Sequence, residues 1–216
     1  MLYNYKQFIN ESRQDIDSIC QKYNIKNYII NEDGSIDVDG DVDLSNRELI
    51  ELPLKFRNVS GYFNCSDNKL TSLEGAPSSV GGDFYCRNNE LTSLEGGPSF
   101  VGGNFNCYRN KLTSLEGAPS SVGGNFYCSG NKLTSLEGFP TLFRATMVID
   151  ISDNPVEEVY DLFSDLKAIE YINETGCINT DTMEVYYIAL LDLWEYSGKA
   201  PKKPENIKLE HYTLVY

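Results

Sequence analysis

The feature that most restricts the fold of this chain is a 21-residue period. Cysteines recur at this spacing at Cys65, Cys86, Cys107 and Cys128, and four copies of one unit follow without a gap over residues 59–142. A fixed period of this length is typical of a solenoid, in which each unit buries its apolar face against its neighbours. The period therefore predicts an elongated domain of stacked coils.

Each unit begins with the alternation expected of a half-buried strand. Phe63 and Cys65 alternate with polar residues, the two-residue period of a strand with one buried face. Asn68 follows, and a buried amide can satisfy backbone groups that a curved loop leaves unpaired. Pairs such as Gly81-Gly82 turn the chain back toward the next strand. Since 21 residues leave little room for a helix, we expect short extended or 3₁₀ connections on the return side.

The spacing of these residues resembles the leucine-rich-repeat pattern LxLxxNxLxxL, with Phe and Cys in the first two apolar positions. Degenerate copies flank the clear ones at residues 38–52 and, after a two-residue insertion, at 149–154. The resemblance implies an α/β solenoid: a leucine-rich-repeat arc of about six parallel-strand rungs over residues 38–154. The full copies place Phe, Cys, Asn, Leu and Leu at Phe63, Cys65, Asn68, Leu70, Leu73; Phe84, Cys86, Asn89, Leu91, Leu94; Phe105, Cys107, Asn110, Leu112, Leu115; and Phe126, Cys128, Asn131, Leu133, Leu136.

Residues 1–37 are predicted to form an N-terminal helix and hairpin cap. Tyr28–Ile30 has the pattern of a strand, residues 32–34 that of a turn, and Ile36–Leu44 that of a second strand leading into the first coil. Over residues 3–23 the apolar side chains that share one helical face are Tyr5, Phe8, Ile9, Ile16, Ile19, Cys20 and Tyr23.

Four aspartates, Asp37, Asp39, Asp41 and Asp43, alternate along Ile36–Leu44 and would share one face of a continuous strand. A calcium site is one interpretation. However, an EF-hand loop placed on the neighbouring glycine would have asparagine at its twelfth position, where the pattern requires glutamate. Solvated carboxylates are the interpretation that we favour.

Residues 155–216 are predicted to form a C-terminal helical cap that hides the apolar end of the solenoid. Asn154-Pro155 favours a helix start, and apolar residues keep helical spacing from Val156 to Ile169. The tail, residues 207–216, has the pattern of a short strand. A second helix is expected to start near Thr180 or Asp181 and to bury Tyr186, Tyr187, Leu190, Leu193 and Trp194.

Composition excludes several classes of function. The net charge of −14 argues against nucleic acid as a ligand, because phosphate binding needs a basic face. The acidic excess is concentrated at residues 31–51 and 150–165, and we favour solubility as its role, with attraction of a basic partner as the alternative. No stretch has the ~20 apolar residues of a membrane span, and no signal peptide opens the chain, so we expect a reducing cytoplasm. The repeat cysteines would stack about 4.8 Å apart and cannot converge on one tetrahedral zinc, which predicts packed core thiols.

In leucine-rich repeats, the outward strand residues form the concave face, and here they vary between copies while the framework is nearly constant. Tyrosine offers a large, rigid contact area at low entropic cost, so this composition favours a protein-binding surface. The alternative is that these side chains only stack along the sheet. The predicted partner-binding residues are Tyr62, Asn64, Asp83, Tyr85, Arg87, Asn104, Asn106, Tyr108, Asn125 and Tyr127. A second column, predicted to be a solvated edge, holds Glu74, Glu95, Glu116 and Glu137, partly offset by Lys69, Lys111 and Lys132.

No catalytic residues, metal ligands or cofactor motif are predicted. His211 is the single histidine and has no accompanying Ser or Cys motif. Some bacterial leucine-rich-repeat effectors carry a ubiquitin ligase with a Cys-x-Asp centre, but here the sequence is Cys177-Ile178-Asn179. A phosphate loop, HExxH and paired catalytic acids are also missing from the sequence, which favours a non-enzymatic protein.

The repeat sequence LTSLEGAPSSVGGNFYC, preceded by DVDGDVDLSNREL, resembles that of short leucine-rich-repeat proteins of tailed bacteriophages. The resemblance covers residues 28–160. This resemblance implies a phage-encoded module in the cytoplasm of the infected host, binding a host protein such as a defence component. The opening residues 5–12 also resemble capsid-targeting peptides of large myoviruses, which are clipped after a Glu that follows an Ile by two residues, as in Ile9-Asn10-Glu11. The second hypothesis is therefore a virion or capsid-packaged structural protein.

Overall fold

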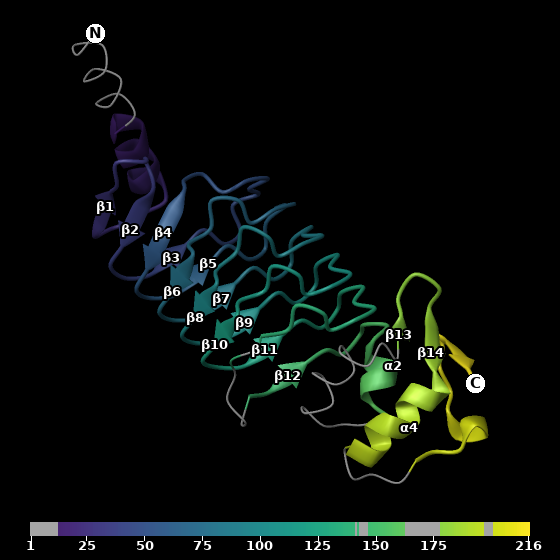
Figure 1. Ribbon diagram of the computed structural model, residues 1–216. Helices are drawn as coiled ribbons and strands as arrows, with labels where there is room; N and C mark the ends of the chain where they lie inside the picture. Colours follow the sequence, from purple (N-terminus) through teal and green to yellow (C-terminus); the bar gives the residue numbers. More distant parts are fainter. Residues whose placement is uncertain (1–12, 141, 143–146, 163–177, 197–200) are drawn as a thin grey trace.

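The computed structural model describes residues 13–140, 142, 147–162, 178–196 and 201–216. The chain coils into a mostly parallel β-solenoid of about 5 turns with few helices. A smaller unit built from residues 178–196 and 201–216 lies at its C-terminal end (Figure 1). The solenoid predicted from the period is therefore confirmed.

Each coil contributes one short strand to each of two sheets. We call the first the front sheet; its six strands all run parallel. They pair across equivalent positions of neighbouring coils, for example Phe63↔Phe84. The register survives the two-residue insertion, because Phe126 still pairs with Ile149. The strands are β3 (Val42–Asp43), β5 (Phe63–Asn64), β7 (Phe84–Tyr85), β9 (Phe105–Asn106), β11 (Phe126–Tyr127) and β12 (Ile149–Asp150).

The second sheet, which we call the return sheet, contains the connections that run back between the front strands. The expected extended connections are confirmed, and they also pair with one another. Its outermost strand is antiparallel and forms the predicted N-terminal hairpin. The strands are β1 (Tyr28–Ile30), β2 (Ile36–Val38), β4 (Phe56–Val59), β6 (Ser79–Val80), β8 (Phe100–Val101) and β10 (Ser121–Val122).

The core consists of columns of identical side chains. The rings of Phe63, Phe84, Phe105 and Phe126 are fully buried and stack with centroids 5.6, 5.7 and 5.0 Å apart. The four repeat cysteines are equally buried and unbridged, as predicted. Burial raises the pKa of the Cys65 thiol to about 12, so the thiol stays protonated at neutral pH.

A column of asparagines satisfies backbone groups inside the coils, as the sequence predicts. Asn110 Nδ2 donates to the carbonyls of Cys86 and Cys107 at 3.1 and 3.0 Å, and its Oδ1 accepts the Leu91 N–H at 3.1 Å. Each amide thus joins its own coil to the preceding one. The other members of the column are Asn68, Asn89, Asn131 and Asn154.

Glycine is required where the return and front sheets meet, because successive coils touch there through backbone alone. A Cβ on Gly102 would lie 2.2 Å from the Gly81 carbonyl oxygen. The adjacent column of glycines includes Gly40, which has φ +130 and separates β2 from β3. The prediction of one strand over Ile36–Leu44 is therefore wrong, since this segment bends at Gly40 into two strands that belong to different sheets.

A helix covers residues 13–22, and its residues Ile16, Ile19 and Cys20 pack on the solenoid core. The Tyr28 hydroxyl donates to Asp17 at 2.6 Å, which joins the hairpin to this helix. Three further residues of the predicted helical face, Tyr5, Phe8 and Ile9, lie outside the described residues.

The C-terminal unit differs from the predicted helical cap. α2 (Glu157–Tyr160) begins close to the predicted start, but its predicted continuation to Ile169 runs beyond the described residues. The second helix, α4 (Tyr187–Tyr196), starts later than predicted, because a strand pair, β13 (Ile178–Asn179) and β14 (Glu184–Tyr186), precedes it. A 3₁₀ turn, η1 (Pro204–Asn206), leads to β15 (Thr213–Val215), the tail strand that the sequence predicts.

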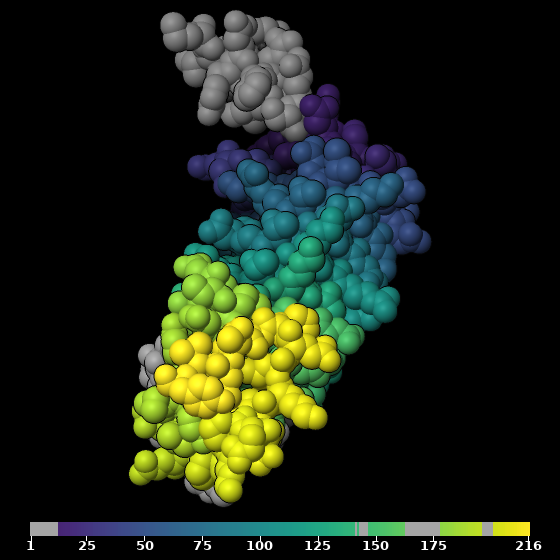
Figure 2. All heavy atoms as spheres, turned by 90° about the vertical axis from the view of Figure 1, so that its right-hand side faces the viewer, coloured from purple at the N-terminus to yellow at the C-terminus, as the bar shows by residue number. Residues whose placement is uncertain are grey.

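The C-terminal unit has a hydrophobic core of its own. Leu190, Leu193 and Trp194 are buried as predicted, whereas Tyr186 and Tyr187 stay partly exposed. The three buried side chains pack with Val159 of α2 in a cluster separate from the solenoid core. Figure 2 shows this unit covering one end of the molecule.

Candidate functional site

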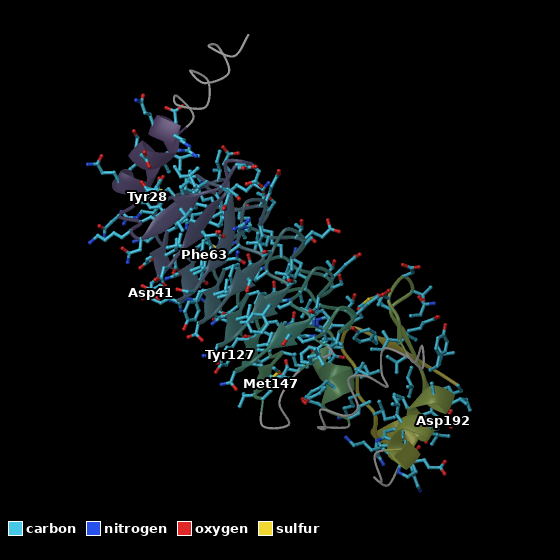
Figure 3. All side chains as sticks on the ribbon, turned by 60° about the vertical axis from the view of Figure 1, so that its left-hand side comes forward. Tyr28, Asp41, Phe63, Tyr127, Met147 and Asp192 are labelled. Carbon is cyan, nitrogen blue, oxygen red and sulfur yellow. The ribbon has the colours of Figure 1, made fainter. Side chains whose placement is uncertain are left out.

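The outward side chains of the front sheet form a continuous surface, which we call the strand face. Figure 3 shows Asp41 and Tyr127 on the same side of the solenoid, with Phe63 inside. Three rows of equivalent positions cross the coils. The first row is Asp41, Tyr62, Asp83, Asn104 and Asn125; the middle row is Asp43, Asn64, Tyr85, Asn106, Tyr127 and Asp150; the last row is Ser45, Ser66, Arg87, Tyr108, Ser129 and Ser152.

In the first row, Asp and Asn side chains hold neighbouring coils together. Asp83 Oδ1 accepts the Asn104 N–H at 2.6 Å, and Asn104 Oδ1 accepts the Asn125 N–H at 2.8 Å. In the same way, Asp41 Oδ1 accepts the Tyr62 N–H at 2.9 Å, and Asn125 Oδ1 accepts the Val148 N–H at 3.0 Å. Asp83, Asn104 and Asn125, which the sequence predicts as binding residues, therefore have a structural role.

In the middle row, the short polar residues close local turns. Asn64 Oδ1 accepts the Ser66 N–H at 3.1 Å, and Asn106 Oδ1 accepts the Tyr108 N–H at 3.0 Å. Such bonds two residues along the chain stabilise the bend after a strand. Asn64 and Asn106 thus also belong to the framework.

The four tyrosines are left as the large side chains that the framework does not use, and all four are partly exposed. Tyr85 donates to the Asp83 carboxylate, which raises its pKa to about 12, with burial adding to the shift. The Tyr127 hydroxyl accepts a hydrogen bond from Asn125 at 2.9 Å. The strand face therefore presents tyrosine rings over a rigid polar network.

Every charged side chain of the first and middle rows is an acid: Asp41, Asp43, Asp83 and Asp150. Burial raises the pKa of Asp150, but hydrogen bonds from Ser152 and Ser129 lower it more, so the group stays charged. Within the described residues, the cations near the face lie outside these two rows, in the last row, in the loops behind it and, as Lys26, in the N-terminal region. Arg87 lies 3.8 Å from Asp67, and Arg109 lies over the Tyr108 ring at 4.9 Å.

The four N-terminal aspartates do not share a face, so that expectation is wrong. Asp37 is in β2 and bonds to Arg57, which lowers the pKa of its carboxyl. Asp39 accepts a hydrogen bond from Ser60 at 2.8 Å, whereas Asp41 and Asp43 face the strand side. Within the described residues, no three His, Cys, Asp or Glu side chains gather as metal ligands would.

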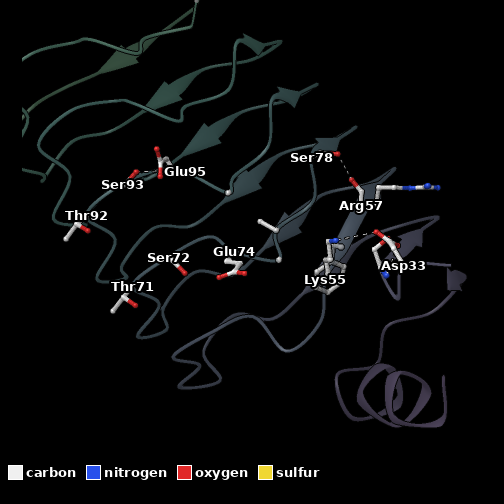
Figure 4. A pocket seen from close by; sticks show the side chains of 15 residues that line it. Asp33, Lys55, Arg57, Thr71, Ser72, Glu74, Ser78, Thr92, Ser93 and Glu95 are labelled. Atoms are coloured by element: carbon white, nitrogen blue, oxygen red, sulfur yellow. Dashed lines mark hydrogen bonds and ion pairs between the residues drawn. The ribbon is translucent and has the colours of Figure 1, made fainter. Parts of the chain in front are cut away.

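A groove of about 680 Å³ runs along the outer side of the return loops (Figure 4). Equivalent residues of successive coils line it, among them Thr71 and Thr92. The four glutamates of the second column are exposed, as predicted. Their predicted compensation by lysines differs, because Lys69 lies near Glu48 at 3.8 Å and Lys111 near Glu90 at 3.0 Å.

A groove of about 870 Å³ separates the solenoid end from the tail and contains His211. The Glu158 carboxylate on α2 accepts the Glu210 N–H at 2.7 Å and also contacts His211 Nδ1. No serine, threonine or cysteine lines the described part of this groove. The pair therefore joins the tail to α2, and Cys177 lies outside the described residues.

Sequence reasoning missed three acids of the strand face: Asp41, Asp43 and Asp150. The signal was present, because Asp41 and Asp43 stand 21 residues before Tyr62 and Asn64. None of the helices in the described ranges has the length and apolar content of a membrane span. Comparisons with known protein families, characterised proteins and solved structures found no match.

Proposed function

We propose that this chain is a non-enzymatic protein-binding module that holds a partner protein on the strand face. The observation that carries the proposal is that two sets of side chains on that face have different roles. Asp and Asn side chains connect and close the coils, while tyrosines at four different places make no such backbone bond. Rigid aromatic rings on a fixed frame are suited to protein recognition, because little side-chain entropy is lost on binding.

The proposal includes the class and origin of the coils. The asparagine column and the six strands of the front sheet support a leucine-rich-repeat solenoid of six rungs. The repeat sequence supports an origin in a tailed bacteriophage, with a host protein as partner and the cytoplasm of the infected host cell as the place of action.

The test is affinity capture from host lysate with matched variants. One variant replaces Tyr62, Tyr85, Tyr108 and Tyr127 by alanine. A control replaces Phe100, an aromatic residue 45% exposed on the return sheet, by alanine. We expect the tyrosine variant to lose a protein that wild type and the Phe100 variant retain, with all three equally folded by circular dichroism. Equal recovery by all three would contradict the proposal.

The motif in residues 9–11 motivates the packaged-protein alternative, and it lies outside the described residues. Mass spectrometry of purified particles separates the two functions. A chain present in particles and cut after Glu11 favours packaging, whereas its absence from particles favours the binding module.

A further inference from the structure

Tyr62 differs from the other tyrosines of the strand face because, among the described residues, its hydroxyl has no hydrogen-bond partner and its ring no cation. Tyr85 and Tyr127 form hydroxyl hydrogen bonds within the face, and Tyr108 lies under the guanidinium of Arg109. The Tyr62 ring is thus free to receive a group from outside.

The surroundings of Tyr62 are acidic. Asp41 and Asp83 lie one coil away on either side in the same row, and Asp43 lies diagonally in the middle row. Burial raises the pKa of Tyr62, and the negative charges of Asp43 and Asp41 raise it further. Tyr62, Asp41 and Asp43 line one pocket of about 440 Å³ at the N-terminal end of the face.

The negative charges of Asp41 and Asp43 are not needed by the framework. Asn104 and Asn125 make the same coil-to-coil bond as Asp41. Asn64 closes the same turn as Asp43. A neutral amide does each structural task elsewhere in the chain, so the two charges are available for another interaction. In their structural bonds, Asp41 and Asp43 each use only the Oδ1 oxygen.

We propose that Tyr62, Asp41 and Asp43 form a binding site for an arginine side chain of the partner, which we call the seat. This inference rests on the proposed function. A planar guanidinium stacks on an aromatic face and donates to carboxylates at the same time, which a compact ammonium group does less well. Arg109 over Tyr108 is an example of this stacking within the molecule. Charge complementarity also favours a basic segment on the first two rows, where all charges are negative.

Two cations line the same pocket and give the proposal a sharp test. Lys26 and Arg47 are exposed there and form no ion pair within the described residues. If the seat takes a guanidinium, they repel it, and their removal strengthens binding. If the pocket takes an anion instead, they attract it, and their removal weakens binding.

The experiment is an NMR titration of the whole chain, following the Tyr62 ring, with the peptide acetyl-Gly-Arg-Gly-amide. Its control is the same peptide with citrulline, which keeps the shape and lacks the charge. We expect saturable shifts with the arginine peptide only. We expect Asp41→Asn with Asp43→Asn to weaken its binding about five- to tenfold, and Arg47→Ala to strengthen it about twofold. Equal binding of the citrulline peptide, no binding of the arginine peptide, or weaker binding by the Arg47 variant would overturn the seat.

Lysate capture separates failure of the seat from failure of the proposed function. If a variant with Tyr85, Tyr108 and Tyr127 replaced by alanine loses the partner while Asp41→Asn with Asp43→Asn retains it fully, the binding face stands and the seat is wrong. If the aspartate variant also loses the partner, the seat is supported. If no tyrosine substitution affects capture, the proposed function is wrong, and the peptide titration alone decides the seat.

Discussion

The repeat solenoid and the C-terminal unit are stabilised in different ways. In the solenoid, the buried asparagines of the four full copies find a backbone carbonyl at a fixed separation, as when Asn110 donates to Cys86 in the preceding coil. In the C-terminal unit the partners follow no period, since β14 pairs with β13 before it and with β15 from the tail. The comparison teaches that a repeated sequence specifies its own contacts, while a single-copy unit depends on contacts that one segment alone does not reveal.

The two regions also have separate clusters of buried residues, although Ile178 packs against both, and within the described residues polar contacts join them as well. Glu158 holds the backbone at Glu210 and His211, and the Tyr212 hydroxyl donates to the Thr134 carbonyl at 2.8 Å. Perturbing each region in turn should therefore show how independent they are.

The largest effect is expected from Asn110→Ala in the asparagine column. The substitution leaves the buried Leu91 N–H without its partner and removes one of the two amide hydrogen bonds to each of the Cys86 and Cys107 carbonyls, which should cost about 4 kcal/mol of unfolding free energy. Urea denaturation followed by circular dichroism measures this. The control is Asn179→Ala in the C-terminal unit, where the amide oxygen accepts two exposed N–H groups and the loss should be about 1 kcal/mol. Equal losses would mean that the column is not the stronger support.

Gly102→Ala should destabilise the solenoid by about 2 kcal/mol, because its Cβ would meet the Gly81 carbonyl and push two coils apart. Gly34→Ala serves as the control. Gly34 has positive φ, which Gly102 does not, and nothing lies within 4 Å of its added Cβ, so Gly34→Ala reports the backbone preference alone. A loss of thermal stability from Gly102→Ala no greater than that from Gly34→Ala would contradict the close packing at this corner.

Alkaline pH should weaken the solenoid through its thiols. The folded pKa of Cys65 is raised to about 12 from an ordinary value near 9, so its contribution is complete below pH 9 and is lost as pH rises toward 12. In that window each such thiol should reduce the unfolding free energy by about 1.4 kcal/mol per pH unit. Denaturation of wild type and Cys65→Ala at several pH values tests this, and parallel pH dependences would contradict it.

The smallest effect is expected at the joint between the two regions. Glu158→Gln keeps an acceptor oxygen but removes the charge, which should cost about 1 kcal/mol of local stability. Hydrogen exchange should then be roughly fivefold faster at the Glu210 and His211 amides and unchanged at Phe105 in the front sheet. Acceleration at Phe105 as well would show that the two regions open together.

The solenoid could be predicted because the repeat gives the same answer several times. Phe, Cys, Asn and Leu occupy the expected columns, and their burial follows from the period. The bend at Gly40 was missed in one strand assignment, although Gly40 stands 21 residues before Gly61 and so belongs to the corner column. Alternation along residues 36–44 indicated a continuous strand, and the glycine overrode it.

The strand face was predicted as a set of outward residues, but not the tasks of its members. The sequence alone does not distinguish an exposed asparagine that contacts a partner from one that accepts a backbone N–H, as Asn104 does. In the C-terminal unit, Asn179 closes a turn by accepting the N–H groups of Asp181 and Thr182. Short polar residues form such bonds both at helix starts and in turns, and the helix start predicted near Thr180 or Asp181 falls in the turn between β13 and β14.

The constant register of the front sheet has a consequence for how such a protein can change its length. Each ladder donor in the clear copies meets a chemically identical acceptor in the neighbouring copy, as Phe63 meets Phe84 and Phe84 meets Phe105. Excising or duplicating one whole 21-residue unit would leave every remaining carbonyl with an equivalent donor. The molecule can therefore be shortened or extended in integral steps, and each step adds or removes one set of surface side chains without redesign of the interior.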